Sequence, residues 1–302
     1  MISMATADTI VIDAPPTPGE VLRAGLATLL KRPPAVPVLP GFRLLRSGVV
    51  VDERAVDDYR TLCGFVAEQG VPPSYPHLLA FPLHLALMMR RDFPYPMAGL
   101  VHVANRIVQH AAIAPRDRLD ITARCDTFHT HPRGQAFTIV AEARRGGATV
   151  WESESSYLRV GASSRSGTPL ALLSGDDAAT DAIATEAIPR AVARRYARLS
   201  GDRNPIHMSW LGARLFGFRQ PIAHGMWTKA RALALVLPRA QSEAVVIDVA
   251  FRAPILLPGR ATFCAEARAD TTDFAVRDPS GTRLHLIGRI GHSHRPGETD
   301  HA

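Results

Sequence analysis

The sequence predicts an α+β fold in which two long central helices are each wrapped by a curved antiparallel sheet. The motif Tyr-x-x-Leu-x-Gly occurs at 59–64 and again at 196–201. Two similar tetrapeptides follow in the same order, Val-Ala-Asn-Arg at 103–106 and Val-Ala-Phe-Arg at 249–252. In both halves a largely apolar helical segment lies between the two repeats, and strand-like segments follow it. This shared order indicates that the chain contains two copies of one unit.

In the first copy, an entry helix is expected over 53–63 and a mostly apolar helix over roughly 78–90. The segments that follow are β-branched or alternate between apolar and polar residues, as half-buried antiparallel strands do. Gly, Pro or Asp bounds several of them. The expected strands cover 99–108, 117–128, 135–144 and 148–160.

In the second copy, the entry helix is expected over 189–199 and the apolar helix over 225–237. The apolar helix carries too much apolar surface to face solvent, so we expect a curved sheet to wrap it. Its apolar residues are Met226, Trp227, Ala230, Leu233, Ala234 and Leu237. The expected strands cover 244–252, 260–270, 273–277 and 282–290.

These elements divide the chain into four parts. Residues 1–40 form an N-terminal extension with a short helix over 19–31 and a proline-rich stretch. The first copy then occupies 41–160. A segment rich in Ser, Gly, Ala, Asp and Thr follows at 161–187 and is expected to be a linker. The second copy occupies 188–295.

The charge pattern argues against a nucleic-acid partner. The formal net charge is +7, but the basic residues are scattered and no aromatic-basic patch is present. Almost all of them are arginines, with lysine only at Lys31 and Lys229. The positive balance would suit an acidic or phosphorylated partner, such as a nucleotide-bearing thioester or a carrier protein.

Compartment is indicated by the cysteines and by the absence of targeting signals. No apolar run approaches the ~20 residues that span a bilayer, so no membrane span is expected. The N-terminus carries Asp8 and Asp13 and no early basic residue, unlike a signal peptide. Three widely spaced cysteines, Cys63, Cys125 and Cys264, argue against a disulfide framework or a zinc site. The expected location is the cytoplasm.

The candidate reactive groups lie in the segment 196–207, which reads Tyr-Ala-Arg-Leu-Ser-Gly-Asp-Arg-Asn-Pro-Ile-His. Asn204 is a favourable N-cap, and Pro205 loses no hydrogen bond at the first helical position. His207 is then expected in the first turn of a helix, with Asp202 in the loop before it. A carboxylate and an imidazole that face one cleft can hold and activate a water molecule.

These residues carry a family resemblance. Ser-Gly-Asp-Arg-Asn-Pro-Ile-His at 200–207, with Pro-Ile-Ala-His-Gly-Met at 221–226, closely resembles the hydratase 2 motif of MaoC-like (R)-specific enoyl-thioester hydratases. Phe-Arg-Ala-Pro-Ile-Leu-Leu-Pro at 251–258 resembles the strand after that family's central helix. The duplicated layout is similar to double hot-dog members, in which one chain supplies both halves of what is elsewhere a dimer. This looser resemblance extends over about 45–290.

The resemblance implies a reaction, the reversible syn addition of water to a trans-2-enoyl thioester to give an (R)-3-hydroxyacyl thioester. It identifies Asp202 and His207 as the catalytic pair and Gly225 as the oxyanion-hole glycine. Around them, Asn204 is expected to cap and position the loop and His224 to support the turn before Gly225. Trp227 is expected to shape the acyl tunnel. The implied partner is an acyl-CoA or acyl-carrier-protein thioester, no cofactor is implied, and a homodimer of the chain stays open.

Two departures from the family pattern qualify the implied site. Simple members often carry a helper serine on the central helix, whereas this chain offers only Thr228 there. In the first copy, Phe65 stands where the second has Asp202, so this copy is expected to complete the sheet and widen the acyl pocket without catalysing. The remaining histidines lack ligand-like spacing, and no metal is expected at His77, His84, His102, His110, His129 and His131.

Two other functions stay open. One is thioester hydrolysis. Hot-dog thioesterases place an acidic residue on the central helix, and 226–237 contains none, which argues against this function. A non-catalytic acyl-thioester-binding subunit is the other alternative, and the Asp/His pair argues against it.

Overall fold

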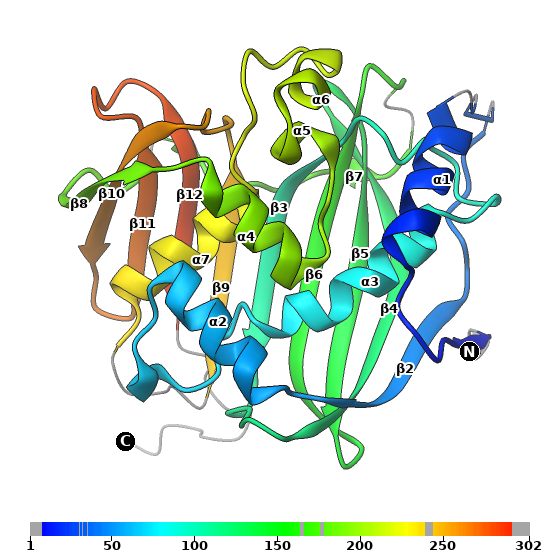
Figure 1. The fold of residues 1–302 in the computed structure, drawn as a ribbon, viewed down its shortest axis with the longest axis horizontal. Helices are drawn as coiled ribbons and strands as arrows, with labels where there is room; N and C mark the ends of the chain where they lie inside the picture. Colours follow the sequence, from blue (N-terminus) through cyan, green and yellow to red (C-terminus); the bar gives the residue numbers. More distant parts are fainter. Residues whose placement is uncertain are drawn as a thin grey trace.

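A single 12-stranded sheet is the framework of the protein (Figure 1). This computed structural model describes residues 8–29, 31, 33–34, 36–163, 166–175, 178–238 and 244–291, so the expected segments at 1–7 and 292–295 lie outside it. All neighbouring strands are antiparallel except two parallel pairs, β1 with β2 and β4 with the short β7. In sheet order the strands are β1 (Thr9–Val11), β2 (Arg43–Val50), β4 (Arg118–His131), β5 (Gly134–Arg145), β6 (Ala148–Val160), β3 (Leu100–Gln109), β9 (Val245–Phe251), β12 (Leu284–Gly291), β11 (Thr271–Arg277), β10 (Gly259–Ala267) and β8 (Ala182–Ile188), with β7 (Thr168–Pro169) beside β4.

The strand order repeats in the two halves of the sheet. Inside the edge strand β1, the first half runs inward as β2, β4, β5, β6, β3. The second half runs β8, β10, β11, β12, β9 from the opposite side. In both halves the innermost strand is the second of the five along the chain.

The halves join where β3 pairs with β9. The two repeated tetrapeptides meet at this seam, because Ala104 and Ala250 are direct register partners. The next register pair, Asn105 with Val249, is followed by Arg106 with Asp248, whose side chains form an ion pair of 2.7 Å. Residues at equivalent positions of a repeat meet in this way beside a local two-fold axis.

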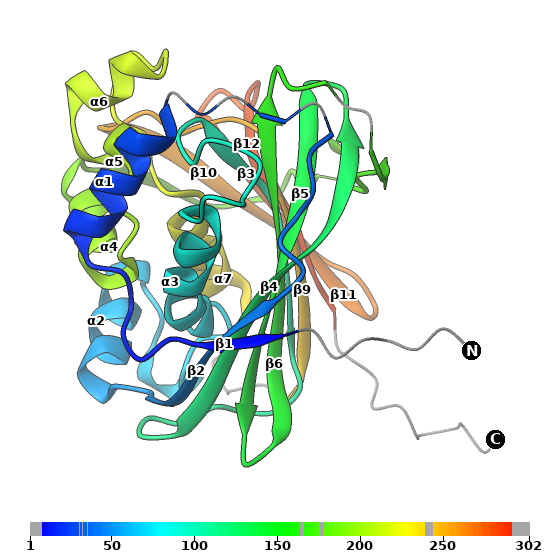
Figure 2. The same ribbon diagram turned by 90° about the vertical axis from the view of Figure 1, so that its right-hand side faces the viewer.

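The helices cover one face of the sheet in two layers (Figure 2). The inner layer consists of α3 (Pro76–Met88) and α7 (Gly225–Val236), which run for 13 and 12 residues. Most of their side chains are buried, in agreement with the apolar composition of both segments. The outer layer contains α1 (Pro18–Leu29), α2 (Glu53–Cys63), α4 (Ala191–Ser200), α5 (Pro205–Met208) and α6 (Trp210–Leu215), and the 3₁₀ helix η1 (Ala67–Gln69) follows α2.

The first repeat forms the two entry helices, α2 and α4. Each ends at the glycine of Tyr-x-x-Leu-x-Gly, since Gly64 and Gly201 adopt the left-handed conformation that closes a helix. The tyrosines of the repeat are buried, and the ring centroids of Tyr59 and Tyr196 lie 6.4 Å apart. The repeat therefore supplies both a helix stop and an aromatic contact between the halves.

The sequence-based prediction missed four strands, β1, β2, β7 and β8. Residues 161–187 were expected to be a linker, but β8 begins at Ala182 and forms the outer strand of the second half, paired with β10. Its small residues and mostly exposed side chains give it little hydrophobic signal. β2, which pairs with β4, was also unexpected, because its buried and exposed positions do not alternate. Part of the N-terminal extension joins the sheet as well, through β1.

No helix in the described part of the chain combines the length and apolarity needed to cross a membrane.

Candidate active site

The loop between α4 and α5 holds Asp202 in a fixed turn. The Asp202 backbone N–H donates to Ser200 Oγ at 3.2 Å, and the Asn204 N–H donates to Asp202 Oδ1 at 3.2 Å. Ser200 in turn donates to the Tyr196 carbonyl at the end of α4. The other carboxylate oxygen, Oδ2, lies on the side of His224, and the Asp202 side chain is 28% exposed.

His207 lies in α5, as the sequence predicts. Asn204 caps this helix by accepting from the Ile206 N–H at 3.3 Å, and Pro205 is its first residue. The buried His207 ring places Nδ1 2.8 Å from the Ile222 carbonyl oxygen. Because a carbonyl can only accept, Nδ1 carries the proton, and Nε2 of the neutral ring carries the lone pair. Burial lowers the pKa of His207, and the charge of Asp202 partly opposes this shift.

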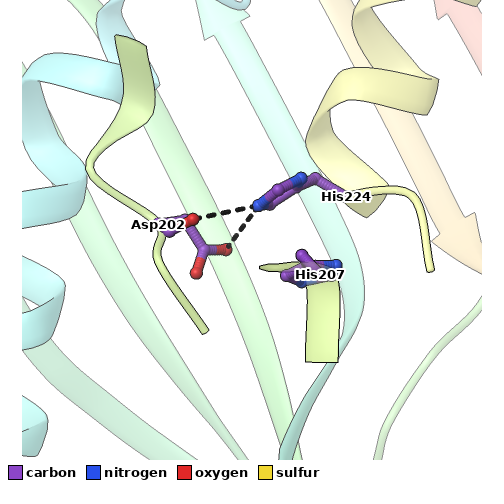
Figure 3. A group of neighbouring side chains, drawn as sticks. All are labelled: Asp202, His207 and His224. Atoms are coloured by element: carbon purple, nitrogen blue, oxygen red, sulfur yellow. Dashed lines mark hydrogen bonds and ion pairs between the residues drawn. The ribbon is translucent and has the colours of Figure 1, made fainter. Parts of the chain in front are cut away.

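His224 fixes the geometry of the two other residues. It is the N-cap of α7 and only 2% exposed. Its Nε2 donates to the Asp202 carbonyl oxygen at 3.0 Å and lies 4.0 Å from Asp202 Oδ2 (Figure 3). Its ring stacks on His207, with centroids 3.7 Å apart and planes inclined by 24°. Burial, with the neighbouring His207, lowers the pKa of His224 to about 3.

The three side chains place potential ligand atoms within 4.8 Å of one another, which raises the possibility of a metal site. Two of the four ring nitrogens, however, are bound to backbone carbonyl oxygens. Nearly parallel stacked rings also direct their in-plane lone pairs alongside one another instead of toward a common point. The geometry of Asp202, His207 and His224 therefore suits proton transfer better than metal coordination.

Gly225 is the first residue of α7, so its N–H has no acceptor within the helix. A Cβ atom at this position would lie 3.0 Å from Phe251 Cε1 of β9. Glycine therefore lets the start of α7 pack closely against this ring. An N–H at a helix start is a favourable partner for negative charge on an oxygen atom. The Thr228 hydroxyl, one turn later, donates to the His224 carbonyl at 3.2 Å and is buried.

The Trp227 side chain contacts the first half of the chain. Its buried indole donates through Nε1 to the Leu62 carbonyl at 3.4 Å, so it anchors α7 to α2 of the first half. A role for Trp227 in shaping an acyl tunnel stays a prediction. In the first half, Phe65 is buried and stacks with Tyr59 at 6.2 Å between centroids.

Three polar groups near the site were not predicted. Lys229 of α7 is fully buried, and its amine donates to Asn105 Oδ1 at 2.6 Å and to the Asn105 carbonyl at 3.3 Å. His102 of β3 and Tyr157 of β6 both experience the charge of Asp202. No sequence motif marks them, because β3, β6 and α7 bring them together from distant parts of the chain.

A surface depression of about 410 Å³ lies beside the strand-like segment that leads to Gly225. Residue Ile255, in its wall, accepts from the Ala223 N–H. Arg260, Arg283 and His285 also line the depression, whereas Asp202 and His207 do not. Asp278 lines it as well, and the two arginines leave a positive balance that suits an anionic group.

Comparison with known proteins identifies the family. The model of the MaoC like domain matches residues 175–278, which include the Asp202–Gly225 site. The chain is 32% identical over 274 residues to 3-hydroxyacyl-thioester dehydratase X of Mycobacterium tuberculosis, covering 88% of this chain and 98% of the relative. The chain thus belongs to the MaoC-like family, and the predictions of this family and of a hydro-lyase are confirmed.

Solved structures agree with the fold. The crystal structure of the same Mycobacterium tuberculosis protein, HtdX, has a TM-score of 0.73 and 29% identity, with 83% of this chain and 100% of that chain covered. A MaoC-like dehydratase from Phytophthora capsici has a TM-score of 0.69 at 16% identity, covering 87% and 99% of the two chains. A Mycobacterium tuberculosis protein described as a double hot-dog fold has a TM-score of 0.55 at 13% identity, covering 82% and 95%. The hot-dog architecture predicted from the sequence is confirmed at this level.

Proposed function

We propose that this protein catalyses the reversible hydration of trans-2-enoyl thioesters to (R)-3-hydroxyacyl thioesters, with dehydration as the reverse reaction. The observation that carries the proposal is the position of His207, which has a ring nitrogen within 4.8 Å of an Asp202 carboxylate oxygen and whose Nδ1 is held by the Ile222 carbonyl, so that Nε2 carries the lone pair. The family supports it, since the similar Mycobacterium tuberculosis protein is named a 3-hydroxyacyl-thioester dehydratase.

In the proposed hydration, one water molecule lies between Asp202 and His207. His207 Nε2 accepts a proton as the water oxygen bonds to C3, and Asp202 orients the water. The same proton then reaches C2 on the same face of the double bond, so one molecule of water is added and no group is lost. A neutral base is required for this step, and burial keeps the pKa of His207 below its ordinary value of 6.5.

The thioester oxygen gains negative charge as the bond to C3 forms. We place this oxygen at the N–H of Gly225, where the start of α7 offers an unpaired donor. Such a donor can lower the barrier by roughly 3–4 kcal/mol. His224 acts as a positioning residue for Asp202 through its bond to the Asp202 carbonyl, and Asn204 caps the helix that carries His207.

We propose that the two halves of the chain have different roles. The half from β8 to β12 carries the Asp/His pair, and the half from β2 to β6 completes the sheet and the substrate pocket without a second pair. The substrate is an acyl-CoA or acyl-carrier-protein thioester in the cytoplasm, and the depression containing Arg260 and Arg283 is a suitable position for its phosphates.

One assay tests the function against its alternatives. The purified protein is incubated with crotonyl-CoA and with a longer enoyl-CoA while enoyl absorbance and free thiol are followed together. Loss of enoyl absorbance without thiol release is expected. Thiol release would instead identify a thioesterase, and binding without either change would identify an acyl-thioester-binding subunit.

A further inference from the structure

The first half of the protein contains a cluster of polar rings that the proposed reaction does not use. His77 and His84 lie on α3, and His102 and Tyr157 are neighbours on β3 and β6. The His102 and Tyr157 rings stack at 4.7 Å between centroids, and His77 lies 6.1 Å from His102 and 5.4 Å from His84. We refer to these four residues as the histidine cluster.

Helix packing does not require these histidines. His77 is the second residue of α3 and His84 the ninth, and both are buried. The second and ninth residues of α7 are Met226 and Leu233, which are also buried. Apolar side chains thus fill these positions in the other half, where the helix packs against the sheet in the same layer.

Each imidazole of the cluster has a nitrogen without a hydrogen-bond partner among the described residues. These atoms are His77 Nδ1, His84 Nε2 and His102 Nε2, and all three are buried. His84 Nδ1 is used, since it lies 3.1 Å from the Tyr157 hydroxyl. Buried polar atoms in folded proteins are normally paired, so three unpaired nitrogens in one cluster indicate a place where a polar group binds.

The cluster adjoins the candidate active site. The His102 ring centroid lies 5.1 Å from that of Phe251, whose ring atoms lie 3.0 to 3.4 Å from the Cβ position of Gly225. The charge of Asp202 acts on both His102 and Tyr157. A thioester held at Gly225 therefore has the cluster as a near neighbour, across Phe251.

The rings are neutral at ordinary pH. Burial is the main cause that lowers the pKa values of all three, to about 3 for His84 and for His102. A neutral imidazole offers one N–H donor and one acceptor lone pair. This set matches an uncharged oxygen group, whereas a carboxylate or phosphate would find no positive charge on these rings.

We infer that the histidine cluster binds a neutral hydroxyl or keto oxygen on the acyl chain of the substrate. The inference rests on the proposed function, because it takes the thioester to lie at Gly225. It assigns the first half a role in selecting the substrate, through hydrogen bonds that a plain alkyl chain cannot make.

The test compares trans-2-decenoyl-CoA with derivatives that carry a hydroxyl or keto group at successive chain carbons. We expect kcat/KM to rise by about tenfold for oxygen at one position, as one buried hydrogen bond allows. In the variant His77→Met/His84→Leu, which copies α7, this ratio should fall to about one. The variant His77→Met/His84→Gln keeps a donor and an acceptor at position 84. Its ratio of kcat/KM for the oxygenated over the plain substrate should lie between that of the parental protein and that of His77→Met/His84→Leu.

The control is His110→Leu, since His110 is exposed and paired with Glu152, and the ratio should stay at the parental value. A ratio near one for every derivative with the parental protein, or an unchanged ratio in the folded double variant, would overturn the inference.

Binding measurements separate this inference from the proposed reaction. Calorimetry with saturated acyl-CoAs of equal length, with and without the oxygen, reports on the cluster alone. A preference for the oxygenated ligand without hydration of any enoyl-CoA would refute only the reaction. Hydration of plain enoyl-CoA, with no preference in either measurement, would refute only the cluster as a binding site.

Discussion

His207 and His224 stack face to face, with ring centroids 3.7 Å apart, and each ring binds a backbone carbonyl through one nitrogen. The two bonds fix the orientation of both rings. They also tie the loop of Asp202 to the start of α7, because His224 donates to the Asp202 carbonyl and directly precedes Gly225. The proposed base His207, the Asp202 carboxylate and the candidate oxyanion donor therefore hold one another in place.

The first prediction concerns the proposed catalytic pair, Asp202 and His207. Asp202→Asn and His207→Ala should each lower kcat for enoyl-CoA hydration by at least ~10²-fold, the lower range for a positioned acid or base. The double variant should lose little more than the worse single variant, because both groups act on one water molecule. Circular dichroism should show a retained fold. Parental activity in folded Asp202→Asn would contradict the assignment.

The second prediction concerns Gly225. The Cβ atom of Gly225→Ala would lie 3.0 Å from Phe251 Cε1, so the helix start or the ring must shift by a few tenths of an ångström. Since a small misplacement of a donor weakens transition-state binding, kcat/KM should fall by about tenfold or more. Adding Phe251→Leu should recover thermal stability without restoring kcat/KM. Full activity in Gly225→Ala would argue against a substrate oxygen close to this N–H.

The third prediction is loss of stability in acid. Burial lowers the pKa values of His84 and His224 to about 3, against 6.5 for an ordinary histidine. Between these values the unfolded chain binds protons that the folded chain does not, so stability falls as pH drops from 6.5 toward 3. Each histidine contributes up to about 1.4 kcal/mol per pH unit. Urea unfolding across this range should show the decline, and it should be shallower in His84→Leu. An equal slope in the two proteins would show that His84 is protonated in the fold.

The fourth prediction is a rise in stability above neutral pH caused by Lys229. Burial lowers the pKa of Lys229 from 10.5 to about 7, although the charge of Asp248 opposes the shift. Between pH 7 and 10.5 the unfolded chain holds the extra proton, so the free energy of unfolding should increase with pH, by up to about 1.4 kcal/mol per unit. Lys229→Met should remove this increase. Urea titrations at several pH values measure it, with Arg118→Met, on the exposed end of β4, as the control.

Local signals predicted the backbone conformation of the segment 200–208 well. Asn204 and Pro205 mark a helix start in the sequence, and the structure places His207 in that helix with Asp202 before it. The repeat Tyr-x-x-Leu-x-Gly predicted two equivalent helices because its glycine has a local role, the left-handed helix stop. These features depend on a few adjacent residues and can be read without knowing the fold.

The missed features depend on partners far along the chain. β8 is a strand because β10 pairs with it, and its exposed small residues carry no pattern of their own. Lys229 resembles a surface lysine in sequence, yet its amine binds Asn105 of the other half. The histidine cluster likewise joins α3, β3 and β6, and no spacing rule connects them.

The pairing of β3 with β9 has a consequence for dilution. Both strands belong to one chain, so the halves remain at the same effective concentration however little protein is present. A site assembled from two separate chains would lose the residues of the second chain when the subunits dissociate. Because both halves belong to one polypeptide, each half always pairs with the same partner half. One half can then keep the Asp/His pair while the other changes its residues for a different task.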